Sequence, residues 1–263
     1  MGQNKTLNVF LTEKANAVTL HFVPFERELT AELQHQQCIL SVDEVERISR
    51  YQKQVMQLQA MQVRVELRTK LTDYAIHHGL HAITPSDWYF IKGKWGKPKL
   101  SDEQFKQTGI HFNLSHSGDW LLLAITHVAD PEKNISMGVD IERSRENTHY
   151  KTILNRYFAR SEIDDLLALS QEADQKQRFY DLWACKESYI KATGKGLATK
   201  LDSFAFDLSK IVFLQKESLL LSNKIELKAL EETEGAYFSI LGRLDVTYRF
   251  ALTLLISAKF NDT

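Results

Sequence analysis

The stretch Gly138-Val139-Asp140-Ile141-Glu142 decides how this chain is interpreted. Apolar and acidic residues alternate in it, which predicts a β-strand with two distinct faces. Val139 and Ile141 then point into a core, and the side chains of Asp140 and Glu142 lie about 6.6 Å apart along the other face. Neighbouring carboxylates repel each other unless a cation lies between them, and oxygen ligands suit magnesium. An edge strand with a solvated acidic face explains the same pattern.

A second segment, residues 183–191, has the spacing of a helix and adds further charged groups. Its residues at offsets 0, 3, 4, 7 and 8 share one helix face, and they are Trp183, Lys186, Glu187, Ile190 and Lys191. A face that mixes apolar and charged residues indicates a helix that lines a half-buried polar site. Glu187 is then a candidate metal ligand, and Lys186 and Lys191 are candidates for binding phosphate oxygens. The alternative is a surface ion pair between Glu187 and Lys191, which contributes about 0.2–0.5 kcal/mol.

A third segment, His111-Phe112-Asn113-Leu114-Ser115-His116-Ser117-Gly118, is interpreted as a loop before an apolar strand. Such a loop presents the hydrogen-bonding groups of Ser115, His116 and Ser117 to one place, and a protonated His116 binds phosphate well. A Ser/His nucleophile pair is the competing interpretation. Adjacent loop residues rarely reach each other as nucleophile and base, and no nucleophile-elbow pattern surrounds Ser115.

The order of predicted elements occurs twice, with the second copy about 120 residues after the first. Each copy has a strand, a long helix and further strands, and the first helix begins with the capping box Ser41-Val42-Asp43-Glu44. Its helical run is expected to continue through Tyr51 to Leu71. We therefore predict an α+β fold of two similar subdomains related by a pseudo-twofold axis, each a small, mostly antiparallel sheet packed on a long helix. The predicted subdomains are residues 1–131 and 132–263, with the active site in the cleft between them.

Composition excludes several classes of protein. The formal net charge of the 263-residue chain is −1, which argues against a nucleic-acid partner. Two distant cysteines, Cys38 and Cys185, form no disulfide framework and fit a cytoplasmic protein. The longest apolar runs fall well short of the roughly 20 residues that a membrane helix needs. We expect no membrane segment.

Five segments in order resemble the larger, Sfp-type 4′-phosphopantetheinyl transferases. The segments that carry the resemblance are Trp95-Gly96-Lys97-Pro98, the run from His111 to Ser117, the run from Gly138 to Glu142, Arg156-Tyr157-Phe158 followed by Glu162, and the signature that begins with Trp183, Lys186, Glu187 and Lys191 and ends with Gly194, Gly196 and Leu197. The resemblance covers about Tyr51 to Phe206. It implies a single chain of two similar α+β halves.

The resemblance also implies an activity. The serine of an apo acyl or peptidyl carrier protein attacks the β-phosphorus of coenzyme A, and 3′,5′-ADP leaves. Magnesium, or alternatively manganese, is implied at Asp140, Glu142 and Glu187. Coenzyme A contacts are implied for Arg47, Lys97, Pro98, Ser115, His116, Ser117, Lys186 and Lys191. The implied catalytic residues are Glu187, Lys191 and His116, with Glu187 as general base either directly or through a metal-bound water.

Two positions depart from the family pattern. Family members carry lysines near Glu44 and Arg47 and an arginine near Gln59, and these grip the nucleotide end of coenzyme A. Here either the grip on the 3′-phosphate is weaker, or Arg64, Lys53 and the lysine-rich segment 92–99 replace it. The alternative functions are an inactive module that binds coenzyme A or a carrier protein, and a metal-dependent nuclease. A single chain with two similar halves needs no second subunit, so we expect a monomer; the carrier protein itself stays unidentified.

Overall fold

The computed structural model describes residues 3–10, 17–128, 133–229 and 236–258. The chain divides into two compact units. The first comprises Met1–Lys92, Pro98–Phe112 and Asp119–Ala129, and the second comprises Gly93–Lys97, Asn113–Gly118 and Asp130–Thr263. The short segments 93–97 and 113–118 therefore belong to the second unit although they precede residue 131. The predicted boundary at residue 131 and the predicted site between the halves stay predictions.

The first unit is built on a four-stranded sheet in the order β1-β2-β6-β5. Its strands are β1 (Lys5–Val9), β2 (Val18–Pro24), β5 (Ile110–Ser117) and β6 (Trp120–His127). β2 pairs antiparallel with both β1 and β6. Leu20, Phe22 and Leu122 are fully buried on these strands, so the alternation of the sequence places a core along the sheet.

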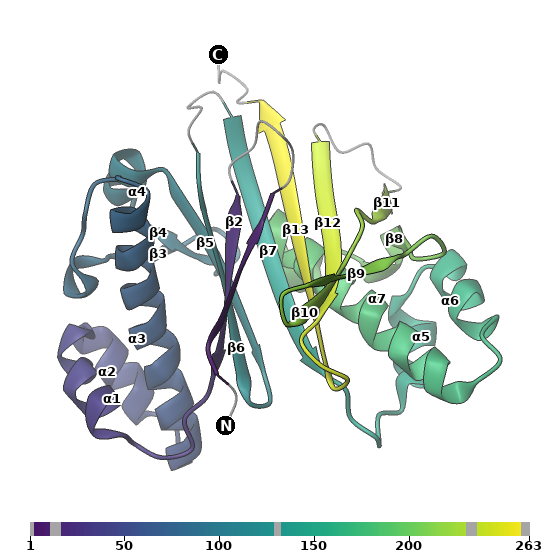
Figure 1. Ribbon diagram of the computed structural model, residues 1–263, viewed down its shortest axis with the longest axis horizontal. Coiled ribbons are helices and arrows are strands. Elements are labelled where there is room, and N and C mark those ends of the chain that lie inside the picture. The colour runs from purple at the N-terminus through teal and green to yellow at the C-terminus, as the bar shows by residue number, and fades with distance from the viewer. Residues whose placement is uncertain (1–2, 11–16, 129–132, 230–235, 259–263) are drawn as a thin grey trace. The chain divides into compact units, whose positions relative to one another are not determined.

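The helices of the first unit gather around one long helix. They are α1 (Ala31–His35), η1 (Gln36–Ile39), α2 (Val42–Ser49), α3 (Gln54–His77), η2 (Pro85–Asp87) and α4 (Asp102–Thr108). A small hairpin of β3 (Phe90–Lys92) and β4 (Pro98–Leu100) completes the unit. Figure 1 shows α1 and α2 beside α3, which packs against β6.

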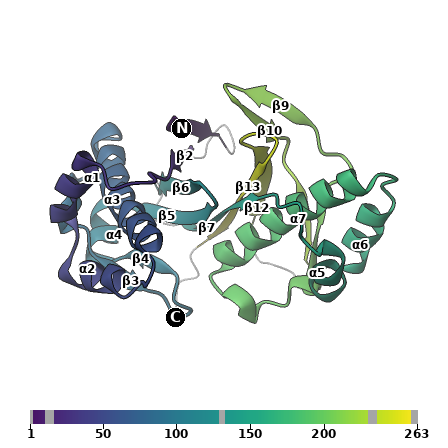
Figure 2. The same cartoon turned by 90° about the horizontal axis from the view of Figure 1, so that it is seen from below.

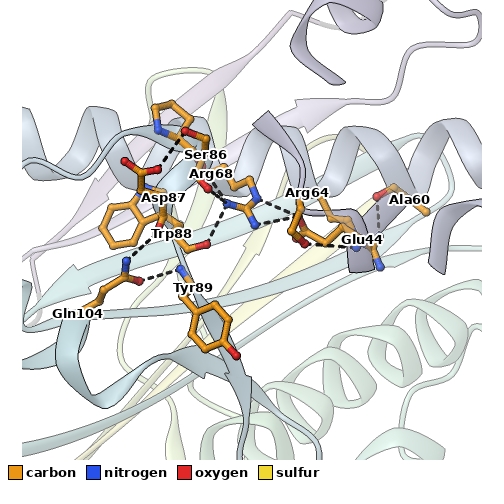
Figure 3. Close-up of polar contacts among 11 residues, drawn as sticks. Glu44, Ala60, Arg64, Arg68, Ser86, Asp87, Trp88, Tyr89 and Gln104 are labelled. Atoms are coloured by element: carbon orange, nitrogen blue, oxygen red, sulfur yellow. Dashed lines mark hydrogen bonds and ion pairs between the residues drawn. The ribbon is translucent and has the colours of Figure 1, made fainter. Parts of the chain in front are cut away.

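The predicted continuous helix through Tyr51 is wrong, because α2 ends at Ser49 and α3 begins at Gln54. Ser41 and Glu44 do form the predicted capping box of α2. Glu44 also reaches the buried Arg68 on α3, with 2.8 Å between the carboxylate and the guanidinium (Figure 3). Because this ion pair holds α2 against α3, the chain has to turn between the two helices.

The second unit contains a five-stranded sheet in the order β7-β13-β12-β10-β9. These strands are β7 (Lys133–Arg143), β9 (Phe213–Lys216), β10 (Leu219–Ser222), β12 (Ala236–Arg243) and β13 (Tyr248–Ala258), and a separate pair is formed by β8 (Phe204–Asp207) and β11 (Glu226–Ala229). These strands pair antiparallel with their neighbours. The second unit therefore repeats the use of a small antiparallel sheet.

One long helix dominates the second unit as well. The helices are α5 (Tyr150–Tyr157), α6 (Arg160–Leu167), α7 (Glu172–Thr193), η3 (Gly196–Ala198) and η4 (Leu201–Ser203). Helix α7 packs on β7, β13 and β12, and α5 and α6 pack beside it (Figure 2). Each unit thus joins an antiparallel sheet to a long helix, which confirms the predicted α+β fold class. Among the described residues, no helix has the length and apolar character needed to cross a bilayer.

Candidate functional site

Strand β7 lies unusually close to helix α7. A Cβ atom added to Gly138 would lie 2.1 Å from the carbonyl oxygen of Ser188 and 2.3 Å from the amide nitrogen of Ala192. Only glycine leaves room for the helix backbone at this point. Because side chains two residues apart leave a strand on the same face, Asp140 and Glu142 are directed to the side where α7 packs.

The end of β5 lies against β7 and contacts it through side chains. Asn113 Oδ1 accepts a hydrogen bond from the backbone N–H of Val139 at 2.8 Å. Ser115 Oγ donates to Asp140 Oδ1 at 2.8 Å, and Ser117 Oγ donates to Glu142 Oε2 at 3.3 Å. We call residues 113, 115 and 117 the serine ladder. The interpretation of this segment as a loop is wrong, because β5 continues through Ser117 and only alternate residues face β7.

His116 leaves the strand on the opposite side from the serine ladder, and its side chain is exposed. Although part of the side chain meets solvent, surrounding protein atoms exclude some water from the imidazole, and this desolvation, followed by the charge of Lys191, lowers the pKa of His116 below its usual value. The neutral imidazole is therefore favoured near pH 7, whereas the sequence suggested a protonated one.

The ammonium group of Lys191 lies at the centre of the site. Its Nζ is 2.7 Å from Asp140 Oδ1 and 2.8 Å from Ser115 Oγ. Asp140 is 3% exposed, and its second oxygen, Oδ2, is buried with no hydrogen-bond partner among the described residues. Burial raises the pKa of Asp140, and the nearby charge of Lys191 opposes this rise.

The charge of Asp140 also affects the pKa values of two further carboxylates, those of Glu142 and Glu187. Burial, and then repulsion from Asp140, raises the pKa of Glu142 to about 7, and hydrogen bonds from Ser117 and Trp183 oppose the rise. The pKa of Glu187 is also raised, first by burial and next by Asp140. The three carboxylates are thus brought into one electrostatic environment by β7 and α7.

Whether these residues suit a metal ion can be judged from their chemistry. Within the parts of the chain that the structure describes, no three His, Cys, Asp or Glu side chains converge as a metal site requires. A buried oxygen of Asp140 with no donor, beside two further carboxylates that Asp140 repels, is nevertheless the donor set of a hard cation such as Mg2+. The residues therefore fit the ion in type and charge, while Lys191 occupies one oxygen of Asp140.

The structure corrects the prediction that Lys186 contacts a phosphate group. Lys186 is fully buried and forms an ion pair with the equally buried Glu162, at 2.8 Å. Its ammonium also donates to the carbonyl oxygens of Leu201 and Phe204, at 2.6 and 2.8 Å. All these groups are internal, so Lys186 holds α7, α6 and the start of β8 together.

The remaining predicted residues lie in different places. Lys97 belongs to the second unit, where its ammonium donates to two backbone carbonyls. Arg47, on α2, and Pro98, at the start of β4, are exposed residues of the first unit. Their predicted contacts with coenzyme A stay predictions. Glu44 is committed to Arg68 and to its own capping box, so it is a structural residue of the first unit.

Sequence reasoning missed two members of the site. Asn113 was not singled out, although its spacing of two from Ser115 and four from Ser117 is the signal of a strand face. Trp183 was placed on the charged helix face, but its effect on the pKa of Glu142, which it lowers, was not foreseen. Its indole also stacks on Phe158 and Phe179, which fixes the ring beside the carboxylate.

A polar cluster of two strand carboxylates, a helical Lys/Glu pair and a serine-bearing strand defines a class of acidic, cation-compatible site. Comparison with known proteins gives the family. A model described as the 4′-phosphopantetheinyl transferase superfamily matches residues 136–238, and one described as the N-terminal part of a 4′-phosphopantetheinyl transferase matches residues 24–128. The site residues on β7 and α7 fall within the first match.

Individual relatives agree. The chain is 31% identical over 199 residues to the 4′-phosphopantetheinyl transferase HetI of Nostoc, covering 76% of this chain and 77% of HetI. It is 36% identical over 144 residues to the 4′-phosphopantetheinyl transferase Sfp of Bacillus subtilis, covering 54% of this chain and 58% of Sfp. The chain thus matches somewhat more than half the length of Sfp. It belongs to the 4′-phosphopantetheinyl transferase family, and the predicted resemblance to its Sfp-type members is confirmed.

Proposed function

We propose that this protein transfers the 4′-phosphopantetheine group of coenzyme A to a serine of an apo carrier protein. In this reaction the serine oxygen forms a bond to the β-phosphorus, the bond from that phosphorus to the bridging oxygen breaks, and 3′,5′-ADP leaves with the bridging oxygen. The observation that carries the proposal is the cluster of Asp140, Glu142, Glu187 and Lys191, which lies in the segment that matches the family.

The residues suit the chemistry of phosphoryl transfer, which depends mainly on positioning and on neutralising charge. We propose that Asp140, Glu142 and Glu187 hold Mg2+ or Mn2+, which supplies positive charge next to the diphosphate. The ammonium of Lys191 is the protein's own cation at this point, and it is tethered by Asp140 and Ser115. The exposed His116 is the adjacent candidate to contact a phosphate oxygen.

Glu187 is the proposed acceptor of the serine proton. The raised pKa of Glu187 lies closer to neutral pH than that of an ordinary glutamate, and a general base works best when its pKa is near the working pH. Glu187 projects from the same helix as Lys191 and is half-buried, so it is accessible to a carrier serine. The proton would therefore move to a Glu187 carboxylate oxygen as the new bond to phosphorus forms.

The cysteines and the proposed chemistry also bear on the location and the oligomeric state of the protein. We propose a cytoplasmic monomer, because the described cysteines, Cys38 and Cys185, are free thiols and the proposed chemistry takes place within one chain. The expected partners are coenzyme A and an acyl or peptidyl carrier protein, with no nucleic acid.

The test is to incubate the protein with coenzyme A, Mg2+ and a panel of unmodified carrier proteins and to record intact masses. We expect one carrier to gain the mass of a single phosphopantetheine, and we expect EDTA to abolish the gain. Glu187→Gln should remove transfer, whereas Glu172→Gln, the same change at an exposed position in the first turn of α7, should not. Binding of coenzyme A with no transfer to any carrier would instead favour an inactive binding module.

A further inference from the structure

The ammonium group of Lys97 is committed to the backbone of the second unit. Its Nζ donates to the carbonyl oxygen of Met137 and to that of Lys191, both at 2.7 Å. Met137 belongs to β7, and Lys191 lies in the last turn of α7. Burial lowers the pKa of Lys97 to about 8, as expected for a cation held among backbone groups rather than in water.

The end of α7 needs such a donor. The last four carbonyls of a helix have no partner within the helix, and they carry the negative end of its dipole. At this end Gly194 donates its N–H to Ile190, Lys97 donates to Lys191, and Ser136 Oγ donates to the carbonyl of Ala192 at 2.6 Å. Thr193 Oγ1 also donates to the carbonyl of Ile190. Lys97 and Ser136 are the donors from outside the helix, and they connect it to the segment 93–97 and to β7.

The contact between α7 and β7 leaves little freedom for sliding. Gly138 allows the two backbones to approach closely. Next to Gly138 on the strand is Met137, and Lys97 bridges the carbonyl of Met137 to the carbonyl of Lys191 on the helix. The same two elements carry the ion pair between Lys191 Nζ and Asp140 Oδ1. A change in the register of α7 on β7 would therefore move the catalytic ammonium relative to the carboxylates.

We propose that Lys97 is a positioning residue, which fixes helix α7 on strand β7 and thereby places Lys191 beside Asp140. This inference rests on the proposed function and revises the phosphate-binding role that the resemblance implies for Lys97. The two roles differ in their kinetic consequences. A positioning residue affects the rate of transfer, whereas a ligand of ground-state phosphate affects the concentration of coenzyme A that is needed.

The kinetic test compares Lys97→Met with Lys210→Met, the same substitution at an exposed lysine of the second unit. We expect Lys97→Met to lower kcat by about 10- to 100-fold, because small displacements of reacting groups are costly. The KM for coenzyme A should change by less than about twofold. Lys210→Met should change neither. A large rise in KM with an unchanged kcat would overturn the inference.

A less disruptive variant keeps the inference testable if Lys97→Met fails to fold. Ser136→Ala removes the neighbouring bond to the end of α7 and leaves a small side chain in place. It should lower kcat in the same direction but by a smaller factor, with KM again unchanged. Melting temperatures of all three variants show whether each is folded. A folded Ser136→Ala with a raised KM and normal kcat would contradict the positioning role.

A second measurement does not depend on activity. Amine acetylation of the wild-type protein, followed by peptide mass spectrometry, compares Lys97 with the exposed Lys94 and Lys99 on the same segment. Without coenzyme A, Lys97 should react at least about tenfold more slowly than these two, because its half-buried and hydrogen-bonded amine is shielded from the reagent, and we expect this shielding to outweigh the larger neutral fraction that its lowered pKa gives. Rapid labelling of Lys97 that becomes slow only with coenzyme A would overturn the inference. If the wild-type protein transfers nothing, the proposed function fails while this labelling result still decides the contact of Lys97.

Discussion

Helix α7 carries two lysine–carboxylate pairs that differ in the completeness of their hydrogen bonds. Lys186 and Glu162 are both fully buried, and each has further backbone partners. The two oxygens of Glu162 also accept from the amides of Ala159 and Phe206, at 3.0 and 2.9 Å. Every charged atom of this pair is therefore bonded inside the protein.

Lys191 lies five residues after Lys186 on the same helix and pairs with Asp140 of β7. The hydrogen bonds of this second pair are incomplete. The side chain of Lys191 is 29% exposed, and Asp140 Oδ2 is buried with no partner among the described residues. Buried polar groups are nearly always hydrogen-bonded, so this oxygen, unlike those of Glu162, remains available to a further donor or cation. The difference teaches that the complete pair of Lys186 and Glu162 maintains the fold, whereas the incomplete pair is the one that the proposed function uses.

The largest effect is expected from Lys186→Met. Removing one partner leaves the charge of Glu162 buried and unpaired, which costs about 3–5 kcal/mol of folding free energy. The double variant with Glu162→Leu should regain most of this loss, because no charge is then stranded. Urea unfolding measures both.

Lys191→Met provides the matched control on the same helix. Because the side chain of Lys191 is 29% exposed, water can replace part of its lost interaction with the buried Asp140, so we expect a smaller cost than for Lys186→Met. Transfer should be lost. Equal destabilisation by the two methionine variants would contradict the distinction between complete and incomplete pairs.

Asp140→Asn should have the second-largest effect, and on activity rather than stability. The amide keeps the shape but removes the charge, so transfer is expected to slow by about 10²- to 10³-fold. The free energy of unfolding should change by less than about 1 kcal/mol, because repulsion from Glu142 and attraction to Lys191 are lost together. Single-turnover transfer and urea midpoints measure the two quantities. Asp174→Asn, an exposed acidic residue in the first turn of α7, should leave both unchanged.

Magnesium should stabilise the incomplete cluster and leave the complete one unaffected. An ion that binds only the folded protein adds about 2.7 kcal/mol at 100 times its dissociation constant. The melting temperature of the wild-type protein should therefore rise with Mg2+ and return with EDTA. Asp140→Asn should abolish the rise, and Lys186→Met should retain it. An equal rise in the Asp140→Asn protein would place the ion elsewhere.

The smallest effect is expected from Ser115→Ala. This change removes the hydroxyl that bridges Asp140 and Lys191, and a single hydrogen bond is worth about 1 kcal/mol. Transfer should fall by about tenfold or less, which corresponds to the same free energy. Ser117→Ala should do less, since the Ser117 contact to Glu142 is longer, at 3.3 Å. A larger loss from Ser117→Ala would reverse the importance assigned to the two rungs of the serine ladder.

Much of the fold followed from local patterns in the sequence. Alternation identified the strand around Asp140, and helical spacing identified the helix around Glu187, because both patterns depend only on which residues avoid water. The break between α2 and α3 was not predicted, since it depends on the ion pair between Glu44 and Arg68, which are 24 positions apart.

The candidate site was predicted less completely, for geometric reasons. Lys186 and Lys191 were placed on one helix face, yet five residues correspond to a rotation of about 140°. The two ammonium groups therefore lie in different surroundings, and only the tertiary structure shows that Lys186 forms an ion pair with Glu162. The partners of Lys97 are backbone carbonyls, which leave no signal in the identity of the residues that bear them.

The serine ladder also covers part of the free edge of β7. β7 is an outer strand of its sheet among the described residues, and such a strand offers free N–H groups to other chains. Asn113 and Ser117 accept the N–H groups of Val139 and Arg143, so side chains cap an edge that another strand would otherwise pair with. Substitutions that loosen residues 113–117 should therefore promote aggregation as well as slow transfer.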